Sequence, residues 1–194
     1  MYISTTLPYS KETLLSFVTD FNQSLWPTQV LFFLLACFAL WGLNSPKEIY
    51  RKAASLILCF FWLHSGLHFY IFSFSEISFL ANYIGIFYVL EAFIVLILLL
   101  RLLPNSPILL SSRKRLVGVF IVTIALFLYP ATVFFLTLTP FAIPVVGITP
   151  LATSLYTLGL ISLLQLDTRG MVVALTIPTL HILLSITFFG FLFN

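Results

Sequence analysis

Long apolar runs, broken by short charged segments, dominate the pattern of hydrophobic and polar positions along the chain. No Asp, Glu, Lys or Arg occurs within residues 21–46, 53–75, 116–166 or 170–194. A helix that spans a bilayer needs about 20 largely apolar residues. Each run is therefore long enough for at least one span, and the pattern predicts an all-α, polytopic membrane protein.

The run over residues 116–166 is too long for one helix. Its middle holds Pro140, Pro144, Gly147 and Pro150, which interrupt helices, so we divide it into two helices and a turn. A transmembrane barrel would need alternating segments of about 10 residues, and the sequence does not alternate over such lengths. We therefore predict one domain, a six-helix transmembrane bundle with crossings near residues 26–43, 53–74, 79–102, 116–138, 146–166 and 171–193.

A further helix is expected ahead of the first crossing. The segment from Ser10 to Leu25 carries apolar residues at the spacing of one helical face, namely Leu14, Phe17, Val18, Phe21 and Leu25. Ser10 is a suitable N-cap. We expect an amphipathic helix that lies in the bilayer interface on the outer, non-cytoplasmic side. The alternative is that the segment is a lid or a binding element.

The composition supports the membrane class. Hydrophobic residues make up 61% of the 194 positions and charged residues 8%, with a mean hydropathy of +1.14. Soluble domains contain about 45–50% apolar and about 25% charged residues. The chain has no soluble basic face, so we expect the lipid bilayer as its partner and no nucleic acid.

The basic residues predict the orientation. One side of the predicted bundle carries nearly all of them, and the other side carries Lys11. By the positive-inside rule, we expect the basic side to face the cytoplasm and both termini to lie on the non-cytoplasmic side. The residues on the basic side are Lys47, Arg51, Lys52, Arg101, Arg113, Lys114, Arg115 and Arg169.

Three ionisable side chains are expected near the middle of the bilayer. His64, Glu91 and His181 each lie about 10 to 12 residues from both ends of their crossings, which puts them at one level. Insertion of an ionised carboxylate at that depth of the bilayer costs about 2.5–3.5 kcal/mol of free energy. We therefore expect Glu91 to find a partner or to stay protonated. The second and third crossings share a short joint, so we predict that His64 pairs with Glu91. His68 lies one turn farther out on the face of His64.

These groups predict a site that binds a proton, an ion or a solute, because His and Glu can titrate. The structural alternative is that each one only makes hydrogen bonds between helices. We predict no cofactor. A haem or metal ion held through His64, His68 or His181 is an alternative, although two histidines and a glutamate do not specify a metal geometry.

The fifth crossing adds a milder polar stripe. Thr149, Thr153 and Thr157 follow one another at four-residue spacing, with Ser154 and Tyr156 beside them. We expect any solute path to run between Glu91 and this stripe, lined by Thr153, Tyr156 and Thr157. The alternative is that these hydroxyls bond their own backbone or a neighbouring helix.

Four short motifs carry a family resemblance, namely Phe21–Gln29 with its Trp-Pro-x-Gln, the cluster of Trp62, Gly66 and His68, the pair Tyr129-Pro130, and Gly147–Gly159. Over nearly its whole length the chain resembles a bacterial family of six-pass membrane proteins of unknown function. The resemblance implies a compact inner-membrane bundle and supplies no activity.

The chain departs from that family pattern at two places. Many members have a Gly-His-x-Tyr-Pro element before the fifth crossing, and a Cys-Pro where this chain has Leu151 and Ala152. If those groups bind metal in relatives, this chain has lost them. The departure therefore weakens the metal hypothesis.

Three functions follow as hypotheses. The first is a small permease or channel, proton-coupled, with Glu91 and His64 as the titrating pair and a water-accessible cavity that reaches Glu91. The second is a non-catalytic subunit or assembly partner, bound to another membrane protein or to a second copy. An integral enzyme or haem protein comes third, because no nucleophile, glycine-rich loop or ligand motif of recognisable spacing occurs.

Overall fold

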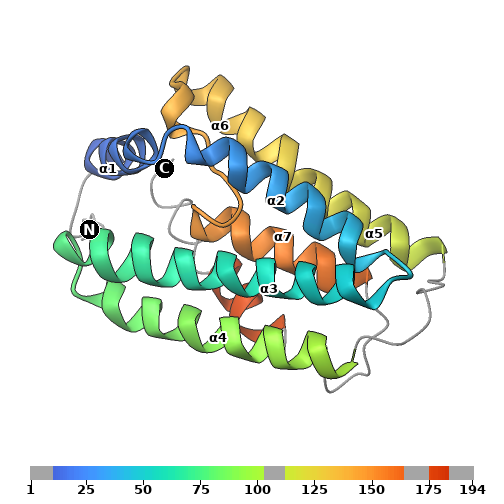
Figure 1. The fold of residues 1–194 in the computed structure, drawn as a ribbon. Coiled ribbons are helices and arrows are strands. Elements are labelled where there is room, and N and C mark those ends of the chain that lie inside the picture. The colour runs from blue at the N-terminus through green and yellow to red at the C-terminus, as the bar shows by residue number, and fades with distance from the viewer. Residues whose placement is uncertain (1–10, 103–111, 164–174, 184–194) are drawn as a thin grey trace, which may run out of the picture.

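The computed structural model describes residues 11–102, 112–163 and 175–183, and these residues are helical nearly throughout (Figure 1). They contain no strand, so the all-α prediction is confirmed. Residues 175–183 are also helical. The elements in chain order are α1 (Lys11–Ser24), α2 (Thr28–Leu43), α3 (Glu48–His64), the π-helix η1 (Ser65–Ser73), the 3-10 turn η2 (Phe74–Glu76), α4 (Leu80–Leu102), α5 (Ser112–Thr123), the π-helix η3 (Ile124–Leu128), α6 (Tyr129–Thr137), the 3-10 turn η4 (Pro140–Ala142) and α7 (Pro150–Leu163).

Three helical stretches are long and apolar enough to cross a membrane. They are Glu48–Glu76, Leu80–Arg101 and Leu116–Thr137, of 29, 22 and 22 residues. The helices α1 and α2 form a pair bent by 85°, which gives a fourth candidate if the pair is one span. By length and composition, three to four helices of the described part of the chain could therefore cross a membrane.

The predicted crossings coincide with helices where the structure describes them. Residues 53–74, 79–102 and 116–138 correspond to the three long stretches. Residues 26–43 correspond to α2, which has 16 residues, and residues 146–166 to α7, which has 14. Most of the predicted crossing at 171–193 lies outside the described residues.

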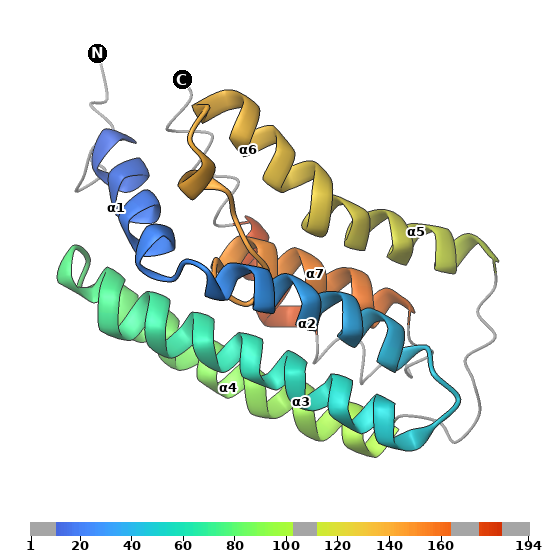
Figure 2. The same ribbon diagram turned by 45° about the horizontal axis from the view of Figure 1, so that its top comes forward.

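The α3–η1 stretch and α4 run side by side in both ribbon views (Figures 1 and 2). Their backbones approach each other at Gly66 and Gly85: a Cβ on Gly66 would lie 3.0 Å from the Gly85 carbonyl oxygen, and one on Gly85 would lie 2.8 Å from the Gly66 oxygen. Small residues that permit such an approach are how helices gain packing contacts in lipid. This contact fixes which face of α4 is turned toward η1.

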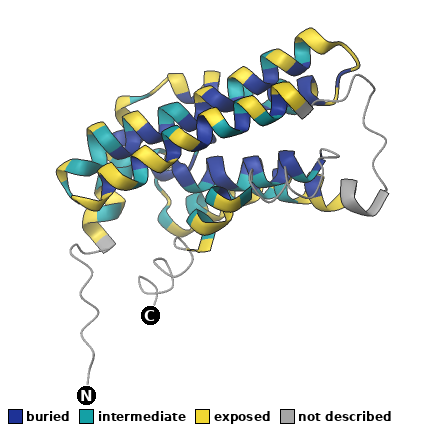
Figure 3. Ribbon diagram, turned by 90° about the horizontal axis from the view of Figure 1, so that it is seen from below, coloured by how far each residue is buried: buried dark blue, intermediate teal, exposed yellow. Residues whose placement is uncertain are grey.

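Helix α7 is the most enclosed helix of the bundle. It meets α5 where Gly118 and Gly159 face each other: a Cβ on Gly159 would lie 2.8 Å from the Val122 nitrogen. Ten of its residues are buried, and Figure 3 shows buried positions on the faces that the helices turn toward one another. Polar groups on α7 are therefore held inside the protein.

The connection between α6 and α7 turns as the prolines predict. Leu138 has a left-handed φ of 53°, η4 follows, and Gly147 has a φ of +83° just before α7 starts at Pro150. A Cβ at Gly147 would overlap the rings of Phe61 and Phe32. Glycine is thus required there by its positive φ and by lack of space.

Helix α1 has the apolar face that its sequence predicts, and this face packs on η1 and η2. Phe17 and Phe21 lie 5.6 and 5.2 Å from the ring of Phe69, and Phe17 lies 5.2 Å from the ring of Phe74. The helix therefore covers one end of the α3–η1 stretch (Figure 2). Its predicted N-cap, Ser10, lies outside the described residues.

Candidate functional site

Glu91 lies at the middle of α4, eleven residues from each end. Its side chain is 0% exposed, and neither carboxylate oxygen has a hydrogen-bond partner among the residues that the structure describes. A buried polar group left without a partner costs about 1–3 kcal/mol, and a charged one costs more. Burial of Glu91 is therefore costly unless its carboxyl group is protonated.

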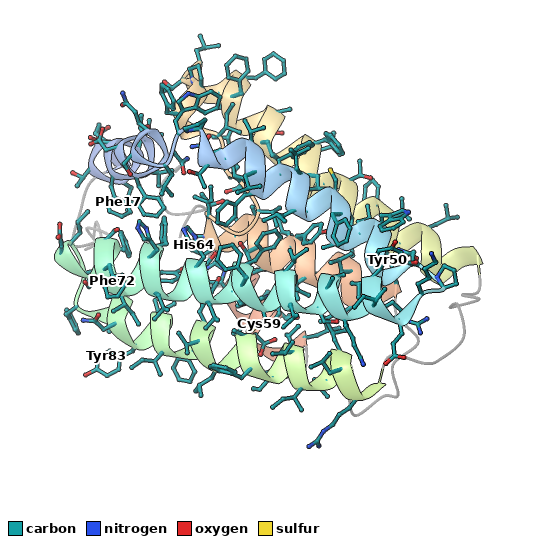
Figure 4. The ribbon with its side chains drawn as sticks, in the orientation of Figure 1. Phe17, Tyr50, Cys59, His64, Phe72 and Tyr83 are labelled. Carbon is teal, nitrogen blue, oxygen red and sulfur yellow. The ribbon has the colours of Figure 1, made fainter. Side chains whose placement is uncertain are left out.

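The predicted pair of His64 with Glu91 is wrong. The Nδ1 of His64 lies 2.8 Å from the carbonyl oxygen of Gly147, and because that oxygen can only accept, Nδ1 donates the hydrogen bond. In Figure 4 the His64 side chain lies on the side of α3 that faces α1 and α2, away from α4. Its ring packs on Phe32 of α2, 4.7 Å away.

The direction of His64 follows from the helix geometry. Trp62 marks the face of α3 that meets α4, because its ring lies 4.5 Å from that of Tyr88. Two residues farther along, His64 is turned by about 200° around the helix axis. Residue counts give His64 and Glu91 a similar depth in their helices. The helix geometry, however, turns His64 to the side of α3 that faces away from α4, the helix that carries Glu91.

His64 and His68 share a face, as predicted. Their rings stack at 5.1 Å with an interplanar angle of 6°. The His68 ring also contacts Phe21 of α1 at 5.4 Å, and its Nδ1 is buried without a hydrogen-bond partner in the described part of the chain. This pair faces α1, on the opposite side of the α3–η1 stretch from α4.

The three candidate residues of the fifth crossing make bonds between elements. Thr153 Oγ1 accepts from the Gly147 backbone N–H at 2.8 Å, and Thr157 Oγ1 accepts from Trp62 Nε1 at 2.8 Å. The hydroxyl of Tyr156 donates to the carbonyl oxygen of Ala36 on α2. These contacts match the structural alternative for the stripe, while its predicted role in binding a solute stays a prediction.

Thr153→Val should destabilise the protein by about 1–3 kcal/mol, because the buried N–H of Gly147 would lose its acceptor. The measurement is thermal or denaturant unfolding in detergent. Thr132→Val is the matched control: Thr132 is exposed on α6 and bonds only its own helix, through Leu128. The control should stay within about 0.5 kcal/mol of wild type. Equal stability of the two variants would contradict the role of Thr153.

His181 belongs to a second polar cluster, which we call the Tyr70–Tyr88 chain. Its Nε2 lies 2.7 Å from the hydroxyl of Tyr70, and its Nδ1 lies 3.3 Å from Ser154 Oγ. Ser154 Oγ in turn lies 3.0 Å from the hydroxyl of Tyr88, which donates to the Pro150 carbonyl at 3.3 Å. The chain joins η1, residues 175–183, α7 and α4.

Sequence reasoning did not single out Tyr70 or Tyr88. Both are buried, at 6% and 1% exposure. The sequence could have indicated Tyr88 through its spacing on α4. Tyr88 precedes Glu91 by three residues and therefore lies on the same face of the helix. Glu91 thus lies beside the Tyr70–Tyr88 chain, about 4.5 Å farther along the helix axis than Tyr88.

A cavity of about 220 Å³ lies between α2, η3, α6 and the segment before α7. None of the predicted site residues lines it, and its walls are apolar: Phe33, Ala125, Leu126, Pro130, Ile143, Pro144, Val145 and Val146. This cavity does not provide the water-accessible path to Glu91 that the permease hypothesis expects. Among the described residues, Glu91 is buried, with 0% of its side chain exposed.

The described residues contain no group of three His, Cys, Asp or Glu side chains close enough to hold a metal ion. His181 has both ring nitrogens within hydrogen-bond distance of hydroxyl groups. A metal or haem at His181 would have to displace Tyr70 or Ser154. The haem and metal alternative stays a prediction.

Comparison with known proteins places the chain in a family. Residues 11–191 match the model of a family of unknown function (DUF6064). No curated protein and no solved structure matches the chain. The resemblance to an unknown-function family is thus supported over nearly the whole chain, and the activity has to be inferred from the site.

Proposed function

The chain belongs to the DUF6064 family of unknown function, and from its geometry we propose that it is a small proton-coupled permease in which Glu91 takes up and releases the proton. One observation carries the proposal. A carboxyl group that is 0% exposed and unpartnered in the described structure occupies the middle of a 22-residue apolar stretch. Ionisable groups at such positions mark substrate, ion and proton pathways.

A proton fits the surroundings of Glu91 better than a metal cation does. A metal ion needs several oxygen or nitrogen ligands around it, and the described residues bring no group of three His, Cys, Asp or Glu side chains together, at Glu91 or elsewhere. A proton needs only the carboxylate itself. Uptake of a proton also removes the charge that makes burial costly.

We extend the proposal to the topology. It has six crossings, with α2 and α7 as the first and fifth and with both termini on the non-cytoplasmic side of a bacterial inner membrane. The α2–α3 joint, with exposed Lys47 and Lys52, lies at the same end of the bundle as Arg101 at the end of α4 (Figure 1). Basic residues gathered at one end support a cytoplasmic location for that end.

The test is proton uptake by purified protein in liposomes that carry a potassium diffusion potential and a trapped pH-sensitive dye. The uptake is measured alone and with a panel of small solutes in the bath. We expect uptake several-fold faster than in protein-free liposomes under at least one condition. Rates equal to those of protein-free liposomes under every condition would contradict the proposal.

A second candidate function is that of a non-catalytic membrane subunit. The stretch Leu116–Thr137 favours it, because only 17% of that apolar window is buried within the chain. Such a face could pack on another membrane protein or on a second copy as well as on lipid. Cross-linking in native membranes, from cysteines introduced on the outward side of α6, tests this candidate: a specific adduct supports it, and adducts to lipid alone oppose it.

A further inference from the structure

The Tyr70–Tyr88 chain connects the neighbourhood of Glu91 with one end of the bundle. Tyr88 lies one turn from Glu91 on α4, and Tyr70 lies in η1, four residues before η2 begins at Phe74. The chain between them passes through His181 and Ser154, with heavy-atom distances of 2.7, 3.3 and 3.0 Å. All of these distances permit hydrogen bonds.

One assignment of the hydrogen atoms satisfies every contact of the chain at once. In it, Tyr88 donates to the Pro150 carbonyl and accepts from Ser154. The single hydroxyl hydrogen of Ser154 is then used, and Ser154 accepts from His181 Nδ1–H. In neutral His181 the other nitrogen, Nε2, is left to accept from Tyr70. Every donor therefore points from Tyr70 toward Tyr88.

We propose that this chain is the route by which protons reach Glu91 from the η2 end of the bundle. The inference rests on the proposed function, and it adds the path to the site. Hydroxyl and imidazole groups can each accept a proton on one side while they release one on the other. That property is what a relay requires and what an ordinary apolar contact lacks.

The relay moves one proton from Tyr70 to Glu91. A proton that arrives at the Tyr70 oxygen is matched by transfer of the Tyr70 hydroxyl proton to His181 Nε2. The Nδ1 proton moves to Ser154, and the Ser154 proton moves to Tyr88. Tyr88 releases its own proton to the Glu91 carboxylate once Glu91 has changed rotamer to meet it and the Tyr88 hydroxyl has turned away from Pro150. One proton enters at Tyr70, one arrives at Glu91, and rotation of the hydroxyls and a flip of the imidazole ring restore the first orientation.

The last link is the part that has to move. The bond from Tyr88 to the Pro150 carbonyl is 3.3 Å long, beyond the usual range of about 2.5–3.0 Å for a hydroxyl donor. Glu91 accepts no hydrogen bond in the described structure, so its carboxylate is not within reach of the Tyr88 hydroxyl there. A rotamer change of Glu91, one turn from Tyr88 on α4, has to bring a carboxylate oxygen to that hydroxyl, and Tyr88 then exchanges a long bond for a bond to the carboxylate.

The experiment compares proton uptake into liposomes for Tyr88→Phe, Ser154→Ala and the control Ser55→Ala. The first two variants remove single oxygen atoms from the chain. Ser55 is also a buried hydroxyl residue, and its hydroxyl donates to the Arg51 carbonyl oxygen within α3, outside the chain. We expect uptake to fall about tenfold or more in Tyr88→Phe and Ser154→Ala, and to stay within about twofold of wild type in Ser55→Ala. Unfolding temperatures are measured alongside, so that a folding defect in one chain variant leaves the other to decide.

Each outcome bears on one claim. Wild-type uptake in either Tyr88→Phe or Ser154→Ala, while Glu91→Gln still blocks uptake, would overturn the route and leave the proposed function standing. An equal loss in Ser55→Ala would also overturn the route, because any missing buried hydroxyl would then suffice. Uptake that persists in Glu91→Gln would instead overturn the proposed function, and the route with it.

Discussion

Glu91→Gln is expected to reduce proton uptake by the reconstituted protein on the order of 100-fold, the scale on which loss of a proton-transfer group slows a reaction. Glutamine has nearly the shape of glutamic acid, but its amide cannot exchange a proton with a relay near neutral pH. The site loses no hydrogen bond in the described structure, because both Glu91 oxygens lack a partner there. The change therefore removes the chemistry of the group and leaves its packing in place.

The control is Glu76→Gln. Glu76 is an exposed glutamate in η2 and undergoes the same chemical change at the bundle surface. We expect its uptake to match wild type. If both variants transport protons at the wild-type rate, with unchanged unfolding temperatures, Glu91 has no role in transport.

Gly147→Ala should destabilise the protein by about 2–5 kcal/mol. The left-handed backbone at φ +83° costs a residue with a Cβ about 1–2 kcal/mol. The new methyl group would also overlap the rings of Phe61 and Phe32, and overpacking of this kind costs about 1–3 kcal/mol. Any shift of the turn would further disturb the bonds that Gly147 makes to His64 and Thr153.

Unfolding in detergent measures this effect, with Ala131→Val as the control. Ala131 is exposed on α6, so added methyl groups there should change the free energy of unfolding by no more than about 0.5 kcal/mol. A Gly147→Ala protein as stable as this control would show that the turn before α7 can accommodate a side chain.

The helices could be predicted from the sequence because each depends on local information. Uncharged runs of the right length located the described helices, and the prolines around Gly147 located the break before α7. The stacked rings of His64 and His68 also follow from four-residue spacing alone. In each case, neighbours along the chain decide the outcome.

The partners of the interior polar groups could not be predicted in the same way. Counting residues gives the depth of a side chain in a span, but its direction depends on which face packs on which helix. That face is set by the close approach of Gly66 and Gly85 and by the contact of Trp62 with Tyr88. His64 was therefore paired with the wrong residue.

Tyr70 and Tyr88 were missed for a different reason. Tyrosine is frequent in membrane proteins as an interfacial and packing residue, so a single tyrosine in an apolar run gives little sign of a polar function. Only the structure shows that Tyr70, His181, Ser154 and Tyr88 meet. Tyr70 lies 111 residues from His181, and Tyr88 lies 66 residues from Ser154, so local spacing does not indicate these contacts.

The central claim is that Glu91 is a membrane-buried carboxyl group that exchanges protons. Its most direct test is labelling of native membranes with dicyclohexylcarbodiimide, a lipid-soluble reagent that reacts with protonated carboxyl groups in apolar surroundings, followed by peptide mass spectrometry. We predict one adduct, on the peptide that contains Glu91, and none on the exposed Glu48 or Glu76. Modification of those two glutamates with Glu91 untouched would contradict the account.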